Sequence, residues 1–192
     1  MRPSNPDQIR AFASVGEFRD WLALHHTSAS ELWLRFARKT SLEVTISKLD
    51  AVREALCWGW IDGQLAHYDE VSFLTRFSPR RAGSAWSRVN RDHAEALIAK
   101  GRMQLAGLAQ VTAAQVDGRW DAAYAAQSTM QVPDDFIDAL EDRPGARDTY
   151  LTLNRANVFA IVYRLETAKT PETRAKRMAA ILDMLARGER FH

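Results

Sequence analysis

Apolar residues recur at helical spacing in two stretches of the N-terminal half, and a capping pattern precedes each stretch. Ser14 and Glu17 have the spacing of a capping box, and the apolar series that follows predicts a helix to about His25. A second capping pattern begins at Ser47. We expect the helix that it opens to end at Gly63, because glycine is the preferred residue just after a helix C-terminus.

Three runs in the same half alternate between apolar and polar residues, which is typical of half-buried strands. They cover residues 32–36, 64–68 and 71–77, with a turn at Asp69 and Glu70 between the last two runs. Because two of the runs are joined by so short a connection, we expect antiparallel pairing. The N-terminal half should therefore contain a small antiparallel sheet.

From about Trp86 onward the apolar spacing is helical again. The expected helices lie at 86–101 and 105–116, and after Pro133, Pro144, Asn154 and Thr170. The predicted fold class is α+β, mostly helical, with the small sheet in the N-terminal part. We expect an α+β domain at 1–126 and a C-terminal helical module at 132–192 packed on it, with a linker at 127–132.

Composition places the chain among ordinary globular proteins. Its 192 residues are 46% hydrophobic and 26% charged, close to the globular average. The single cysteine, Cys57, excludes an intramolecular disulfide and fits a reducing compartment. No signal peptide is visible, and no apolar run approaches the roughly 18 residues of a membrane span. Cytoplasmic localisation without a membrane span is the expectation.

Charge is unevenly distributed, although the formal net charge is only +2. Basic residues dominate 76–102 and 164–190, whereas acidic residues dominate 117–148. Pairing between these segments within the chain would account for the alternation. A basic surface that binds nucleic acid is the alternative interpretation, but so modest a net charge argues against it.

The stretch from 58 to 91 is the richest in side chains that carry chemistry. The candidate ligand-binding residues are Trp58, Trp60, Asp62, Arg80, Arg81, Ser84, Trp86 and Asn90. Arg80 and Arg81 precede a helix start and could hold a phosphate or carboxylate, while Trp86 could stack on the ligand. Asp62, at the end of the second predicted helix, is disfavoured by the helix dipole and would need an arginine partner. The alternative is purely structural pairing of these arginines with Asp62 or Glu70.

The same stretch resembles the bacterial YdeI or OmpD-associated (bacteriocin-protection) family. The likeness is carried by the motifs WGWIDG at 58–63, FSPRR at 77–81, SAWSRVN at 84–90, GRM at 101–103, GRW at 118–120, VPDD at 132–135 and AKTPETR at 168–174. It extends over nearly the whole chain. The resemblance implies a role in bacteriocin protection or envelope stress, but no reaction and no catalytic residue.

Three functional hypotheses follow. The first is a stress- or bacteriocin-protection protein with a cleft for an anionic small molecule. The second is an enzyme with Asp62 as general base, whose pKa burial would raise and an arginine partner would lower. The third is a module that binds nucleic acid or an unidentified protein partner. Phosphate-binding glycine loops, nucleophile elbows and clustered metal ligands are absent from the sequence, so neither a cofactor nor a metal is predicted.

Overall fold

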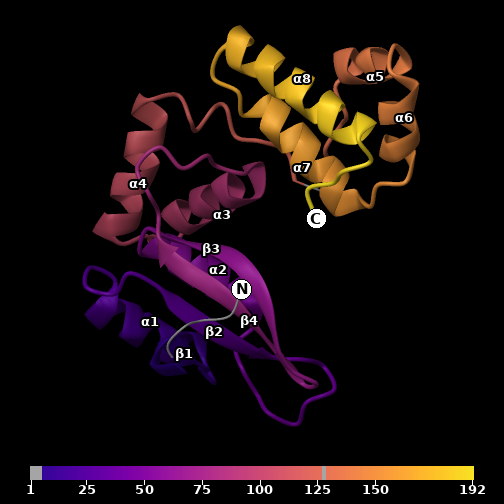
Figure 1. Ribbon diagram of the computed structural model, residues 1–192. Helices are drawn as coiled ribbons and strands as arrows, with labels where there is room; N and C mark the ends of the chain where they lie inside the picture. The colour runs from indigo at the N-terminus through magenta and orange to yellow at the C-terminus, as the bar shows by residue number, and fades with distance from the viewer. Residues whose placement is uncertain (1–5, 127–128) are drawn as a thin grey trace. The chain divides into compact units, whose positions relative to one another are not determined.

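A computed structural model describes residues 6–126 and 129–192, which form two compact units (Figure 1). Unit 1 comprises Met1–Trp86 and Asn90–Ala122, and unit 2 comprises Ser87–Val89 and Ala123–His192. The fold is α+β, as predicted, with a sheet in the N-terminal half and helices throughout the C-terminal half. Of the expected linker at 127–132, residues 127 and 128 lie outside the described part of the chain.

The helices and strands follow one another in a simple order. In the N-terminal part they are the 3-10 helix η1 (Pro6–Gln8), β1 (Ile9–Arg10), α1 (Val15–His25), β2 (Leu32–Ala37), α2 (Lys48–Cys57), β3 (Trp60–Asp69), β4 (Ser72–Pro79), α3 (Arg88–Ala99) and α4 (Leu105–Val116). The C-terminal part contains α5 (Asp134–Glu141), α6 (Pro144–Leu151), α7 (Arg155–Glu166) and α8 (Pro171–Ala186).

Local capping signals place the helix starts where the sequence predicts them. The Ser14 hydroxyl accepts a hydrogen bond from the backbone N–H of Glu17 at 3.2 Å, and α1 begins at Val15. The hydroxyl of Ser47 likewise accepts from the backbone N–H of Asp50 at 3.1 Å and starts α2. Each bond satisfies one of the backbone donors that a helix N-terminus leaves unpaired.

The predicted end of α2 at Gly63 is wrong. The helix ends at Cys57, because Gly59 adopts a φ of +75° that directs the chain out of the helix. Trp60 then begins β3, which runs to Asp69 and pairs with β4. Asp62 therefore lies on a strand, and the argument from an unfavourable helix dipole does not apply to it.

The sheet has the order β1-β2-β4-β3, and it is mixed. The pairs β2–β4 and β3–β4 are antiparallel, as expected, whereas the two-residue strand β1 pairs parallel with β2. One face of the sheet carries the main core of unit 1, where Phe18 and Leu22 of α1 pack with Leu34, Phe36 and Phe77. The opposite face carries a smaller cluster, made of Trp33, Ala66 and Leu74.

The end of α2 lies unusually close to α4, and glycine permits the approach. A Cβ atom at Gly107 would lie 2.4 Å from the carbonyl oxygen of Cys57 and 2.7 Å from that of Leu56. A Cβ at Gly59 would lie 2.9 Å from the carbonyl oxygen of Ala106. Side chains at these two positions would collide with backbone, which cannot yield as a flexible side chain would.

Unit 2 has a core of its own, built by the four helices α5–α8. The core residues are Phe136, Leu140, Ala146, Ile161, Leu165, Ile181, Leu182 and Leu185. The buried side chain of Asn157 fixes the C-terminal residues, because its Oδ1 accepts from the backbone N–H groups of Phe191 and His192 at 3.0 and 3.1 Å. The Arg164 guanidinium lies 3.8 Å from the centre of the Phe191 ring.

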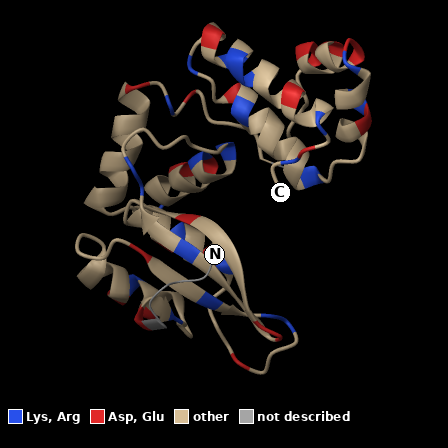
Figure 2. Ribbon diagram, viewed as in Figure 1, with Lys and Arg blue, Asp and Glu red and all other residues tan. Residues whose placement is uncertain are grey.

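Both units carry acidic and basic residues (Figure 2). In unit 2, Asp135 of the acidic segment forms an ion pair with Arg174 of the basic tail at 2.5 Å, and Arg143 pairs with Asp183. Pairing within the chain thus accounts for part of the charge alternation. Among the described residues, none of the helices is both long and apolar enough to span a membrane.

Candidate functional site

The structure brings the tryptophan-rich and arginine-rich segments together in unit 1. Trp60 of β3 is opposite Pro79 of β4, and the backbone N–H of Arg80 donates to the carbonyl oxygen of Gly59 at 2.9 Å. The indole N–H of Trp60 donates to the carbonyl oxygen of His26 at 3.1 Å, and its side chain is buried in the main core. This indole is therefore part of the packing of unit 1.

Arg80 and Trp86 contact each other directly and are almost fully enclosed. The guanidinium carbon of Arg80 lies 3.9 Å from the centre of the Trp86 ring, and Trp120 packs against Trp86 edge-on with centroids 4.8 Å apart. Arg80 is 5% exposed and Trp86 is 1% exposed. Nη1 of Arg80 also donates to the carbonyl oxygen of Ala85 at 3.0 Å. We call Trp60, Arg80, Trp86 and Trp120 the Trp/Arg junction.

The remaining candidates lie around this junction with partners of other kinds. Asp62 forms an ion pair with Lys48, in which Oδ2 of Asp62 lies 3.4 Å from Nζ of Lys48. The cation beside Asp62 is therefore a lysine, whereas an arginine was expected. Trp58 is half-buried, and its ring lies 4.8 Å from that of His26. The carbonyl oxygen of Ser84 accepts from Nη1 of Arg119 at 2.9 Å. Of the other two candidates, Arg81 is exposed and Asn90 is half-buried. Ligand binding by these residues remains a prediction.

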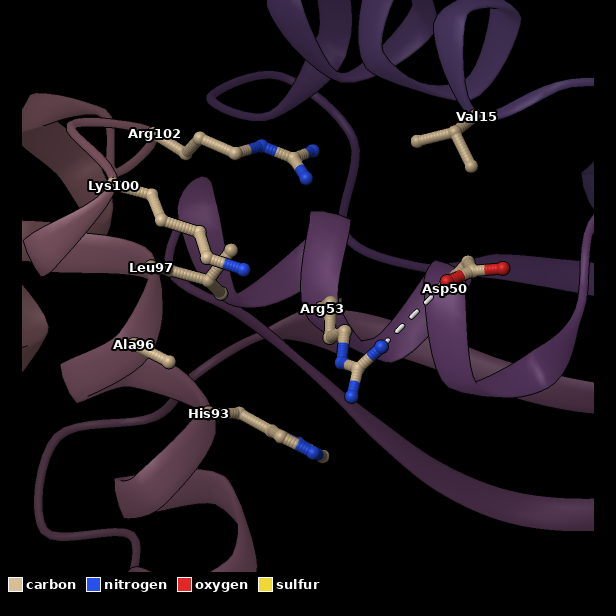
Figure 3. Close-up of a pocket in the computed structure, with 8 residues that line it drawn as sticks. All are labelled: Val15, Asp50, Arg53, His93, Ala96, Leu97, Lys100 and Arg102. Carbon is tan, nitrogen blue, oxygen red and sulfur yellow. Dashed lines mark ion pairs between the residues drawn. The ribbon is translucent and has the colours of Figure 1, made fainter.

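An open pocket of about 200 Å³ lies elsewhere in unit 1 (Figure 3). It is lined by Val15, Asp50, Arg53, His93, Ala96, Leu97, Lys100 and Arg102. The residues come from the start of α1, from α2, from α3 and from the connection between α3 and α4. We call this the cationic pocket, because three of its eight lining side chains carry a positive charge and only one carries a negative charge.

A buried carboxylate holds one side of the cationic pocket in place. Glu54 is 2% exposed, and its two oxygens accept from Nε of Arg19 at 3.0 Å and from Nη2 of Arg102 at 2.6 Å. Arg19 and Arg102 are 46% and 40% exposed, so water still reaches both guanidiniums. One carboxylate shared by two guanidiniums leaves a positive charge in excess at this edge of the pocket.

The other cations of the pocket are held loosely. Nη1 of Arg53 lies 3.9 Å from Oδ1 of Asp50, a distance too long for a hydrogen bond. For Lys100 there is no ion pair within the described part of the chain. Burial lowers the pKa of His93, the positive charge of Arg53 lowers it further, and Asp92 opposes the shift. The lowered pKa favours the neutral imidazole of His93, which can donate a hydrogen bond from one ring nitrogen and accept one at the other.

Other features of unit 1 give weaker support for a functional site. Burial and the nearby Glu54 raise the pKa of the Cys57 thiol to about 11, so the thiolate that a nucleophile requires does not form at neutral pH. A second hollow, of about 480 Å³ and more open, lies beside the end of β2 and includes Lys39. Within residues 6–126 and 129–192, no cluster of three or more His, Cys, Asp or Glu residues could hold a metal ion.

Sequence reasoning missed every residue of the cationic pocket. His93 and Leu97 lie one turn apart in α3, and Lys100 directly follows this helix, so their mutual proximity was predictable. The positions of Arg53 on α2 and of Arg102 in the α3–α4 connection beside these residues were not predictable. Contacts between separate helices leave no periodic signal in a single sequence.

Two family-wide sequence models match the chain. Residues 10–110 match the family described as Domain of unknown function (DUF8412), which covers more than half of the chain and includes the cationic pocket. Residues 129–188 match the family described as Bacteriocin-protection, YdeI or OmpD-Associated, which confirms the resemblance in the C-terminal part. The motifs at 58–90 lie within the first match. No curated protein and no solved structure gave a significant match. The chain therefore belongs to the DUF8412 family and carries a C-terminal domain of the YdeI or OmpD-associated, bacteriocin-protection family.

Proposed function

We propose that this protein is a bacteriocin-protection or stress-protection protein whose unit 1 binds a small anion in the cationic pocket. The protective role rests on the family match at 129–188. The anion-binding role rests on one observation, a concave site of about 200 Å³ whose lining groups carry an excess of positive charge. The two parts of the proposal are independent, and the experiment below addresses the second.

The distribution of charge supports an anionic ligand. Arg53 and Lys100 lack a hydrogen-bonded carboxylate partner in the described part of the chain, since the ion pair of Arg53 with Asp50 is 3.9 Å long. Arg102 shares its carboxylate, Glu54, with Arg19. An anion entering the pocket would meet two cations, Arg53 and Lys100, that no tight ion pair already neutralises, and a third, Arg102, that shares its carboxylate.

The apolar part of the lining supports a ligand that is more than a bare ion. Val15 and Ala96 line the pocket, and Leu97, which is 5% exposed, forms part of its wall. Apolar atoms beside the cations exclude some water from the pocket, and charge interactions are stronger where water is excluded. Pockets that combine an apolar wall with a few convergent polar groups are typical of small-molecule sites.

Anion binding can be tested by thermal unfolding of the full chain in increasing concentrations of inorganic phosphate, at constant ionic strength set with chloride. A ligand that binds only the folded state raises the unfolding temperature as its concentration increases. We expect phosphate to stabilise the native chain and to stabilise Arg53→Gln and Lys100→Gln much less. Lys39→Gln, in the second hollow, is the matched control and should respond like the native chain. Equal stabilisation of all four proteins, or of none, would refute the proposal.

A further inference from the structure

We infer that the anion bound in the cationic pocket is the dianion of a phosphate monoester with a short apolar substituent. The inference rests on the proposed function, which assigns anion binding to this pocket, and goes further by naming the charge and the size of the ligand. It is carried by the number of charged groups, by the two sides from which the cations approach, and by the volume available.

The charged groups of the pocket and of its buried anchor leave two positive charges in excess. The positive groups are Arg19, Arg53, Lys100 and Arg102, and the negative groups are Asp50 and Glu54. A ligand with two negative charges balances this set, whereas a monocarboxylate or a sulfate ester would balance only half of it. Phosphate monoesters carry about two negative charges above their second pKa of about 6.

The geometry suits a group with several acceptor oxygens. Arg53 comes from α2, whereas Lys100 and Arg102 both come from the connection between α3 and α4, so the cations approach the space from two sides (Figure 3). A carboxylate presents two oxygens in one plane, which one guanidinium can satisfy. The three terminal oxygens of a phosphate monoester point in divergent directions and can accept from three separated donors.

The volume limits the remainder of the ligand. About 200 Å³ corresponds to roughly seven water molecules at about 30 Å³ each. A phosphate group and a substituent of two or three carbons fill such a space, with the substituent against Ala96 and Leu97 on one side of the pocket (Figure 3). A nucleotide would not fit inside, and only its terminal phosphate could enter.

Two ligands of matched shape test the charge requirement. Methyl phosphate and methyl sulfate have nearly the same size, but at about pH 8 the first carries two negative charges and the second carries one. Titration calorimetry on the full chain should show that methyl phosphate binds at least about tenfold more tightly than methyl sulfate. In Lys100→Gln and Arg53→Gln, which leave one positive charge in excess, that preference should fall severalfold. Lys39→Gln should retain it.

The possible outcomes separate this inference from the proposed function. Equal affinity for the two esters would overturn the dianion inference and leave anion binding in the pocket intact. Absence of binding by both esters and by inorganic phosphate would overturn the proposed function as well. A preference for methyl phosphate that survives in both variants would place the site elsewhere and also overturn the inference.

Discussion

The Trp/Arg junction and the cationic pocket both contain arginines, yet they use them in opposite ways. In the junction, Arg80 is 5% exposed and lies against Trp86, so its charge is already engaged by an indole ring and a carbonyl oxygen. In the pocket, Arg53 and Arg102 are 42% and 40% exposed. The comparison teaches that the side chains of a rare and chemically rich motif can be enclosed by packing, while common surface residues line the more accessible pocket.

The difference has a physical origin. A tryptophan buries a large area but needs a partner for its N–H, and an arginine loses hydration when buried, so each is costly to enclose alone. In the junction the Arg80 cation lies on the face of the Trp86 ring, which offsets part of its lost hydration. The stacking leaves the buried indole N–H of Trp86 without a hydrogen-bond partner among the described residues. Packing of this kind accounts for the enclosure of Arg80 and Trp86 together, while ligand binding by them stays a prediction.

The largest expected effect tests how tightly the region beside the junction is packed. Gly107→Ala should lower the free energy of unfolding by about 3 kcal/mol, because the new Cβ would meet the backbone of Cys57. Gly16→Ala is the matched control in another helix, where the Cβ meets nothing closer than 3.7 Å. It should be neutral or stabilise by about 0.5 kcal/mol. Urea unfolding curves measure both, and a tolerated Gly107→Ala would show that α2 and α4 can separate.

Arg80→Ala should destabilise the chain by about 3 kcal/mol, since it removes a desolvated cation–π contact of about 2 kcal/mol and a hydrogen bond of about 1 kcal/mol. Arg81→Ala, at the exposed neighbouring position, should change stability by less than about 0.5 kcal/mol. Both variants should keep the stabilisation by phosphate. A variant that folds stably but is no longer stabilised by phosphate would contradict the comparison, because the junction would then be the binding site.

Glu54→Gln should reduce stability by about 2 kcal/mol, because a carboxylate that is 2% exposed loses two charged partners. The loss is smaller than for an isolated buried pair, since both arginines can be rehydrated. Removing this negative charge should at the same time strengthen phosphate binding. Weaker binding in the variant would instead show that Glu54 is needed to position Arg102.

The smallest expected effect concerns pH. The pKa of His93 is lowered by burial and by Arg53, against the opposing effect of Asp92, so the folded state favours neutral His93. Below a pH of about 6.5 the unfolded chain takes up this proton first, and stability should fall until the pH passes the lower pKa of the folded state. His93→Gln should show a shallower decline. Sulfate, which remains a dianion in this range, should also reduce the decline in the native chain by favouring protonated His93; an unchanged decline would contradict a site beside His93.

Sequence reasoning succeeded where structure is determined locally. Ser14 and Ser47 set the starts of α1 and α2, because capping needs only residues within one turn. It failed at Trp60, which the apolar spacing places in a helix but which begins the strand β3. Gly59 ends the helix, and the partner of Trp60 is Pro79, 19 positions later, which helical spacing cannot reveal. The two-residue strand β1 is likewise too short to show a pattern.

The candidate site was predicted in part. The convergence of the segments around Trp60 and Arg80 was expected, and these segments do lie side by side. How deeply their side chains are buried was not predictable, because burial depends on residues that are distant in the sequence. Here Trp120, from a later segment, packs against Trp86. The cationic pocket escaped prediction because Arg53, His93 and Lys100 are ordinary residues whose meeting depends on how separate helices pack.

The most direct measurement is a map of backbone amide chemical shifts during titration of the full chain with inorganic phosphate. If the pocket is the anion site, the largest changes will fall at Arg53, His93, Lys100 and Arg102, while residues 78–86 change little. Changes concentrated at Trp58, Arg80 and Trp86, with none around the pocket, would contradict the account and return the site to the junction.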